Sequence, residues 1–208
     1  SGRHSKDQKT IDALIVEAAL AGRRVVRLKG GDPAIFARAT EEIDACRAAG
    51  IGVRICPGIT AASAAAADLG LSLTLRGLAR KLVFVTAHAR KGETLDLDWA
   101  ALADPRATLA VYMGKAAAGE ISRQLIAHGL SGSTPVAIVE NASLPAMRVF
   151  RGRLDLLGLM ARTAIGDGPA LLLVGEAAGQ RGALHGEADF GAPAVPAIPL
   201  ADAAAIGN

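Results

Sequence analysis

Four short segments of the sequence place small or polar residues directly after apolar runs, where a ligand could bind. The first is Gly30-Gly31-Asp32-Pro33, which follows the run VVRL at 25–28. Glycine lacks a Cβ, so the backbone there can touch a ligand or adopt a positive φ. Asp32 and Pro33 suit the cap and the first residue of a helix. The pattern therefore predicts a strand, a loop and a helix, and open α/β sheets bind ligands beyond the carboxyl ends of such strands.

The other three segments are PGITAA at 57–62, Met113-Gly114, and Glu140-Asn141-Ala142. PGITAA puts small residues and one hydroxyl at a helix start, where backbone N–H groups are free to bind a ligand. Each segment taken alone also has an ordinary structural interpretation. Asp32 is typical of a helix cap, Met113 of core packing and Asn141 of a turn. Only their combination points to a shared cleft between two units.

Residue patterns for nucleophilic, metal or nucleotide-triphosphate chemistry are absent from the sequence. No serine lies in a G-x-S-x-G context, and the four histidines show no spacing of four residues. The two cysteines, Cys46 and Cys56, form no C-x-x-C pair, so we expect no metal site. There is no P-loop and no complete G-x-G-x-x-G. A site of this kind must act mainly by orientation and electrostatics.

Hydrophobic periodicity and turn residues predict the elements that position these loops. A capping box from Ser5 to Gln8 opens a helix that Gly22 ends. Next come a strand at 25–28, a helix from Pro33 to Gly50 that buries Ile35, Phe36, Ile43 and Cys46, a strand at 51–55 and a helix at 60–69. Beyond the turn residues at 72–79 we expect strands at 82–86, 109–112, 136–139, 148–153 and 170–174, with helices near 98–103, 117–128 and 154–163. The strands at 136–139 and 148–153 are predicted to pair antiparallel.

This order predicts two α/β units, residues 1–76 and 77–180, followed by a disordered Gly-, Ala- and Pro-rich tail at 181–208. The first unit has only two predicted strands, which are too few for a stable sheet. We therefore expect either that a partner covers its edge or that the chain begins within a larger domain.

Bulk composition narrows the function classes. The chain has 208 residues, 51% hydrophobic and 3% aromatic, and a net charge of +3 with a pI near 9.1. The mild basic excess suits an anionic small molecule, and with so few aromatics it argues against nucleic acid. No apolar run is long enough to cross a membrane, and the start lacks a signal pattern. These features predict a cytoplasmic protein.

Seven segments in order resemble the tetrapyrrole methylases, most closely those members that methylate uroporphyrinogen III. They are GRHS at 2–5, VVRLKGGDPAIF at 25–36, PGITAA at 57–62, LTLRGLAR at 73–80, VYMG at 111–114, VEN at 139–141 and GPALLLVGE at 168–176. The resemblance covers the chain up to about residue 180, and seven ordered motifs are far more specific than one.

The resemblance implies a two-domain α/β fold and C-methylation of uroporphyrinogen III to precorrin-2, on the path to sirohaem and cobalamin. S-adenosyl-L-methionine would be the methyl donor, and the enzyme would be a homodimer. The residues that it implies for cofactor binding are Gly30, Gly31, Asp32, Ile35, Thr60, Ala61, Met113, Ala142 and Ala170. The substrate's carboxylates would suit four arginines, which could equally be solvated surface charges: Arg3, Arg38, Arg76 and Arg148.

Two departures from the family pattern qualify this interpretation. Family members begin with a strand, a loop that carries a proposed acidic base and a second strand that ends in a lysine, all before the segment matching Gly2. Their absence here predicts an N-terminally truncated member with an incomplete first domain, impaired activity and no assignable catalytic residue. The run Ala37-Arg38-Ala39-Thr40 also replaces a glycine-rich run. Two alternatives therefore remain: a methylase of a later precorrin, or a non-catalytic fragment that acts as a binding module.

Overall fold

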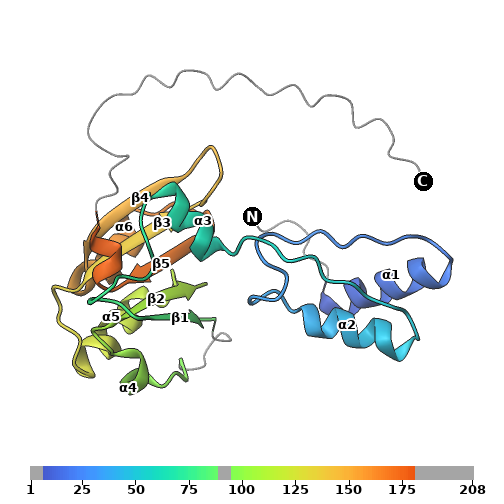
Figure 1. The fold of residues 1–208 in the computed structure, drawn as a ribbon, viewed down its shortest axis with the longest axis horizontal. Helices are drawn as coiled ribbons and strands as arrows, with labels where there is room; N and C mark the ends of the chain where they lie inside the picture. Colours follow the sequence, from blue (N-terminus) through green and yellow to red (C-terminus); the bar gives the residue numbers. More distant parts are fainter. Residues whose placement is uncertain (1–6, 89–94, 181–208) are drawn as a thin grey trace.

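A five-stranded mixed sheet organises most of the described chain. The computed structural model describes residues 7–88 and 95–180. The strands β1 (Lys81–Thr86), β2 (Ala107–Tyr112), β3 (Pro135–Glu140), β4 (Arg148–Arg153) and β5 (Ala170–Val174) lie in the order β1-β2-β5-β3-β4 (Figure 1). β1 and β2 are parallel, and the other neighbours are antiparallel. The predicted antiparallel pair at 136–139 and 148–153 is confirmed as β3 and β4.

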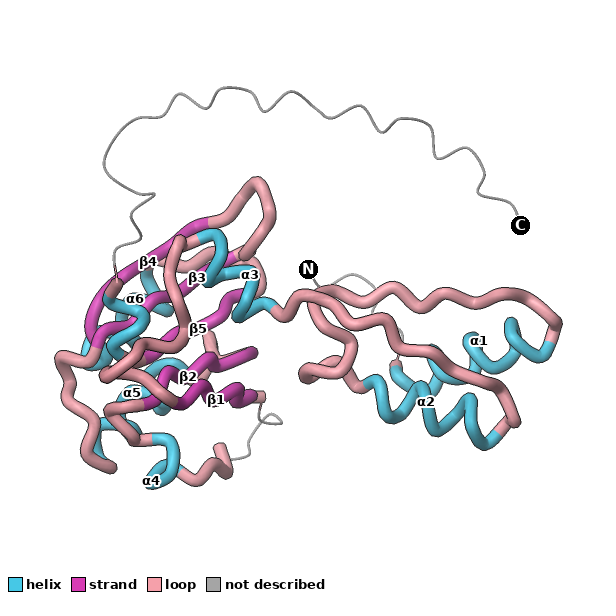
Figure 2. Tube along the Cα trace, viewed as in Figure 1, coloured by secondary structure: helices cyan, strands magenta, loops and turns pink. Residues whose placement is uncertain are grey.

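Six α-helices and two short 3-10 turns accompany these strands in the described residues (Figure 2). The helices are α1 (Gln8–Leu20), α2 (Ala39–Ala48), α3 (Ala61–Asp68), α4 (Trp99–Leu102), α5 (Ala118–Ala127) and α6 (Leu157–Thr163), and the turns are η1 (Leu154–Leu156) and η2 (Glu176–Gly179). The fold is therefore α/β, as predicted. Asp7 caps α1 by accepting a hydrogen bond from the Thr10 amide at 2.8 Å. The predicted cap, Ser5, lies outside the described residues.

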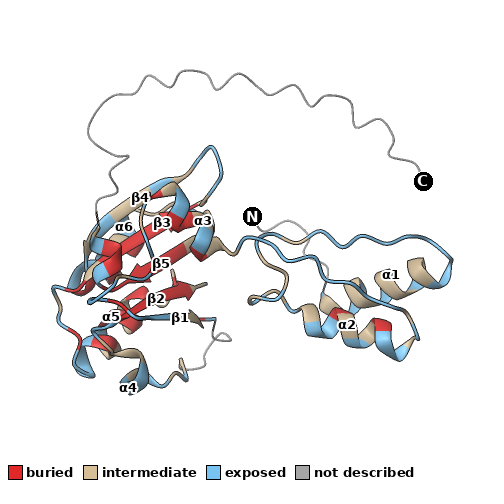
Figure 3. Cartoon of the chain, viewed as in Figure 1, coloured by how far each residue is buried: buried red, intermediate tan, exposed pale blue. Residues whose placement is uncertain are grey.

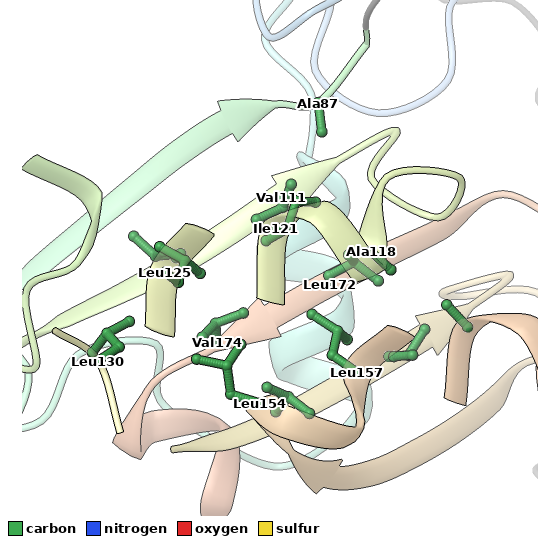
Figure 4. Close-up of a cluster of buried hydrophobic side chains, with 14 of the residues drawn as sticks. Ala87, Val111, Ala118, Ile121, Leu125, Leu130, Leu154, Leu157, Leu172 and Val174 are labelled. Atoms are coloured by element: carbon green, nitrogen blue, oxygen red, sulfur yellow. The ribbon is translucent and has the colours of Figure 1, made fainter. Parts of the chain in front are cut away.

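Side chains alternate between the two faces of the sheet along each strand, and both faces are apolar. Helices therefore cover both faces. One face packs Leu109, Val111 and Leu172 against Ile121 of α5 and Leu157 of α6 (Figure 4). The other face packs alanines and leucines of β2, β3 and β5 against α3, whose inward residues are Ala62, Ala65 and Ala66. Small side chains on both partners let α3 lie close to the sheet. This aliphatic core is what the low aromatic content predicts.

The two strands predicted at 25–28 and 51–55 are wrong. Neither segment forms a strand or pairs with another within residues 7–88 and 95–180. A strand needs a neighbour for its backbone N–H and C=O groups, and the sequence pattern reports only side-chain alternation. Without that neighbour the apolar side chains remain exposed, with Val26 at 74% and Leu28 at 81%. Figure 3 shows most of the segment between α1 and α2 in the colour of exposed residues.

The helix predicted to begin at Pro33 is also wrong in its start. Residues 33–38 form turns, and α2 begins at Ala39. Phe36 and Arg38 adopt left-handed backbone conformations, with φ of 50° and 55°, and a right-handed helix cannot pass through them. Of the four residues predicted to be buried by this helix, only Cys46 is.

The division into units at residues 76 and 77 stays a prediction. Figure 1 shows α1 and α2 together in a lobe apart from the sheet. α3 comes before the predicted boundary, yet it packs on the sheet. The predicted tail at 181–208 lies outside the described residues.

Candidate functional site

Asp32 connects the first two predicted loops. One carboxylate oxygen, Oδ1, accepts a hydrogen bond from the Ala34 amide at 2.7 Å, and Oδ2 accepts one from the Gly58 amide at 3.1 Å. The sequence predicted that Asp32 caps the following helix. This is wrong, because the chain turns at Asp32 instead of entering a helix. Its carboxylate holds the Gly30 loop against the Pro57 loop, although 26 residues separate Asp32 and Gly58.

Two glycines allow these loops to touch. Gly31 has a φ of +75°, a conformation that side chains disfavour. A Cβ on Gly58 would overlap the carbonyl oxygen of Gly31 and lie 3.2 Å from the Cα of Asp32. Gly30 differs, since a Cβ there would meet no protein atom within 4 Å. The backbone at Gly30 thus faces space that another molecule can fill.

Tyr112 joins both loops to the end of β2, immediately before Met113. Its phenol oxygen hydrogen-bonds the Thr60 hydroxyl at 2.5 Å and accepts from the Ala62 amide at 3.2 Å. Its ring lies 5.0 Å from that of Phe36, centroid to centroid, and 5.8 Å from that of Phe84. Sequence reasoning missed Tyr112. The only available signal was its place before Met113 in the VYMG segment.

Met113 and Ala170 line one hollow of about 410 Å³, a size within the range of small-molecule sites. Lys115, Ala116, Ala161, Arg162, Gly168 and Pro169 line the rest of it. Met113 is 48% exposed and has a φ of 55°. A left-handed methionine costs about 1–2 kcal/mol, so the surrounding structure must impose this conformation. The strained turn thus places Met113 in the lining of the hollow.

Ala142 lies between two residues with left-handed backbones, Asn141 and Ser143. Two hydrogen bonds to Asp68 at the end of α3, from the Ser143 amide at 2.8 Å and its hydroxyl at 3.0 Å, hold this turn. The backbone N–H of Asn141 also donates to the Pro169 carbonyl at 2.9 Å. The Ala142 turn is thereby tied both to α3 and to the segment that carries Ala170.

The structure links the nine predicted residues without placing all of them around one hollow. Asp32 connects the Gly30 and Pro57 loops, which carry Gly30, Gly31, Ile35, Thr60 and Ala61. Tyr112 connects these loops to Met113, and Pro169 connects Ala142 to Ala170. The 410 Å³ hollow itself includes only Met113 and Ala170 of the nine.

Comparison with known proteins shows to which family the chain belongs. The family model described as Tetrapyrrole (Corrin/Porphyrin) Methylases matches residues 1–157. The chain belongs to this family. A siroheme synthase of Zymomonas mobilis is 48% identical over 179 residues, which are 86% of this chain and 37% of that protein. The chain therefore spans well under half of that curated relative.

Two further tetrapyrrole methylases have similar sequences or structures. A uroporphyrinogen-III C-methyltransferase of Paracoccus denitrificans is 47% identical over 179 residues, 86% of this chain and 62% of that protein. A crystal structure of uroporphyrin-III C-methyltransferase from Thermus thermophilus in complex with S-adenyl homocysteine superposes with a TM-score of 0.70 at 35% identity. That match covers 83% of this chain and 74% of the other.

The arginines that the resemblance suggests for binding substrate carboxylates differ from one another in their contacts. Arg38 forms two 2.6 Å hydrogen bonds with Glu41, which raise its pKa and lower that of Glu41. Arg148 lies 3.4 Å from the buried Glu140, donates to the Ala164 carbonyl and stacks over Phe150. Arg76 is exposed, and Arg3 lies outside the described residues.

The described residues contain neither a metal-binding group of side chains nor a membrane-spanning helix. Within residues 7–88 and 95–180, no group of three or more His, Cys, Asp or Glu side chains could hold a metal ion. Cys46 is buried, Cys56 is exposed, and both are free thiols. Among those same residues, no helix is long and apolar enough to cross a membrane.

Tyr112→Phe tests whether the phenol oxygen organises the loops of the candidate site. The variant keeps the ring contacts with Phe36 and Phe84 but removes both hydrogen bonds and leaves the Ala62 amide without its acceptor. We expect affinity for S-adenosylhomocysteine to fall by about 1–2 kcal/mol, or roughly tenfold. Calorimetric titration measures the affinity, and thermal unfolding checks that the fold persists. Unchanged affinity would show that Tyr112 does not shape a ligand site.

Proposed function

We propose that this chain is the methyl-transfer part of an S-adenosyl-L-methionine-dependent uroporphyrinogen-III C-methyltransferase that makes precorrin-2 for sirohaem and cobalamin. The observation that carries the proposal is the Tyr112 contact with Thr60, which joins the Pro57 loop to the Met113 turn, while Asp32 joins the Pro57 loop to the Gly30 loop. The names of the siroheme synthase and methyltransferase relatives support the choice of reaction.

The residues present fit a sulfonium nucleoside. Gly30 offers backbone beside open space, and Gly31, Thr60 and Ala61 add little side-chain bulk. Ile35, Met113, Ala142 and Ala170 would supply apolar surface, while the Asp32 carboxylate holds the first two loops together. When bound, the sulfonium supplies an electrophilic methyl group, so no protein nucleophile is required.

The work left to the protein is therefore orientation. Fixed loops hold a donor and an acceptor in reactive geometry, and such positioning accounts for a large part of many enzymatic rate enhancements. Substrate carboxylates would find Arg76 exposed, and they would compete with Glu41 for Arg38 and with Glu140 for Arg148. No residue of the chain is assigned as the acid or base.

Binding and product mass test the proposal together. We expect the 208-residue chain to bind S-adenosylhomocysteine weakly in calorimetry. We expect it to methylate uroporphyrinogen III to precorrin-2 more slowly than the Paracoccus enzyme assayed alongside. Product mass spectrometry distinguishes this reaction from methylation of a later precorrin. If the chain showed no binding and no methyl transfer at millimolar cofactor, the proposal would be contradicted and a non-catalytic binding module would be favoured. Turnover equal to that of the Paracoccus enzyme would contradict the expected impairment.

The homodimer and the cytoplasmic location stay predictions. Sedimentation velocity of the purified chain measures the first directly, because a monomer and a dimer differ twofold in mass.

A further inference from the structure

Glu42 on α2 is a buried carboxylate at the junction of three segments. It is only 8% exposed, and Cys46 is the other buried residue of α2. The Lys29 ammonium donates to Glu42 Oε2 at 2.7 Å, and the Arg27 Nε donates to Oε1 at 3.1 Å. Gln8 of α1 reaches the same Oε1 at 3.4 Å. One carboxylate thus ties α1, α2 and the extended segment that carries Lys29.

Lys29 is the residue immediately before Gly30. Its side chain is 11% exposed, so its charge depends on Glu42 for compensation. A buried ammonium that loses its partner is strongly unfavourable. The chain would therefore have to rearrange to bring Lys29 into water. That rearrangement would move the backbone entering Gly30.

A continuous set of contacts leads from Glu42 to the second loop. Glu42 holds Lys29, the chain continues through Gly30 and Gly31 to Asp32, and Asp32 accepts from the Gly58 amide. α1 contributes no buried residue, and α2 only two, so apolar packing does little to fix this lobe. The polar cluster around Glu42 is its main internal tie.

We propose that Glu42 is a positioning residue that acts through Lys29 to fix the Gly30–Asp32 backbone, and thereby sets the affinity of the cofactor site without touching the cofactor. The role in affinity rests on the proposed function. The role in fixing the backbone does not.

The charges around Glu42 keep it ionised. Burial by itself raises the pKa of Glu42, but the hydrogen bonds from Lys29, Gln8 and Arg27 outweigh burial, so its pKa lies below the ordinary value. The other charged groups nearby are Asp12, which shares Gln8, and Arg38 and Glu41 at the start of α2. A carboxylate with a lowered pKa stabilises the fold above its unfolded pKa and loses that contribution as pH falls through the folded value. The tie is complete at neutral pH.

Glu42→Gln tests the inference, with Asp44→Asn as the matched control. Asp44 lies on the same helix, is exposed and pairs only with Arg47 among the described residues. In the 208-residue chain, the amides of Ala34, Ile35 and Gly58 hydrogen-bond Asp32. Their hydrogen exchange is expected to rise at least tenfold in Glu42→Gln, because losing the charged hydrogen bond to Lys29 frees the backbone that carries Asp32. Exchange should stay unchanged in Asp44→Asn and, for both variants, in β2, β3 and β5. Equal exchange in the two variants would overturn the role in positioning.

Cofactor affinity provides the second, separate measurement. For Glu42→Gln we expect about a tenfold rise in the dissociation constant of S-adenosylhomocysteine, with kcat at saturating cofactor unchanged. The double variant Lys29→Met/Glu42→Gln should bind no more weakly than Glu42→Gln alone, since both substitutions remove the same contact. Additive effects, or a fall in kcat with constant affinity, would overturn the inference. Failure of the unmodified chain to bind would contradict the proposed function, while hydrogen exchange would still decide the role in positioning.

Discussion

Gly58→Ala is expected to reduce affinity for S-adenosylhomocysteine by forcing the Gly30 and Pro57 loops apart. The new Cβ would overlap the Gly31 carbonyl oxygen, and both groups belong to backbone that no rotamer change can move. The loops must separate, which also breaks the bond from the Gly58 amide to Asp32. Overpacking of this kind costs about 1–3 kcal/mol, so we expect affinity to fall by roughly 5- to 150-fold. Calorimetric titration at matched protein concentration measures it.

Gly52→Ala is the control for this substitution. Gly52 lies in the segment leading to the same loop, and its Cβ would meet nothing within 4 Å. Its affinity and unfolding temperature should match those of the unmodified chain. If Gly58→Ala bound as tightly as Gly52→Ala, the close approach of the two loops would have no part in ligand binding.

Gly30→Ala is expected to impair binding while leaving the fold intact. The structure leaves its Cβ free of protein contacts within 4 Å, and no positive φ is required there. Unfolding free energy should therefore change by less than about 0.5 kcal/mol. A methyl group pushed into a ligand's space is worth roughly 10- to 200-fold in discrimination, so affinity should fall by at least tenfold.

This variant separates ligand contact from structural damage. A loss of affinity with unchanged stability requires the ligand itself to meet the new methyl group. Full affinity in Gly30→Ala would show that the cofactor does not lie against Gly30, and the assignment carried by the family resemblance would be wrong at that position.

The sequence predicted the sheet well because each of its strands contains its own signal. Val136 and Ile138 face one core and Ala137 and Val139 the other, so this strand is buried on both faces and stands out in the sequence as a short continuous apolar run. Turn residues then separate β3 from β4, which makes their pairing predictable. Local patterns suffice where neighbours in the sheet follow from short connections.

The segments at 25–28 and 51–55 show where local patterns fail. Both have strand-like side chains, but strand formation depends on a hydrogen-bonding neighbour that no residue in the segment specifies. Pro33 likewise favours a helix start, yet left-handed backbones at Phe36 and Arg38 delay α2 by six residues.

The contacts that hold the candidate site together were hidden for a related reason. Tyr112 bonds Thr60 across 52 residues, and Asp68 bonds Ser143 across 75. Each partner taken alone has an unremarkable type and setting, so only the folded chain shows that they meet. Family resemblance supplied the loops, and the structure supplied the residues that join them.

Amide hydrogen exchange of the 208-residue chain, with and without saturating S-adenosylhomocysteine, tests the central claim most directly. If loops of both units bind one cofactor, protection should appear together in peptides covering residues 29–35, 58–62, 111–116, 141–143 and 168–171. Protection confined to one side, with either the Gly30 loop or the Met113 turn unchanged, would contradict a shared site.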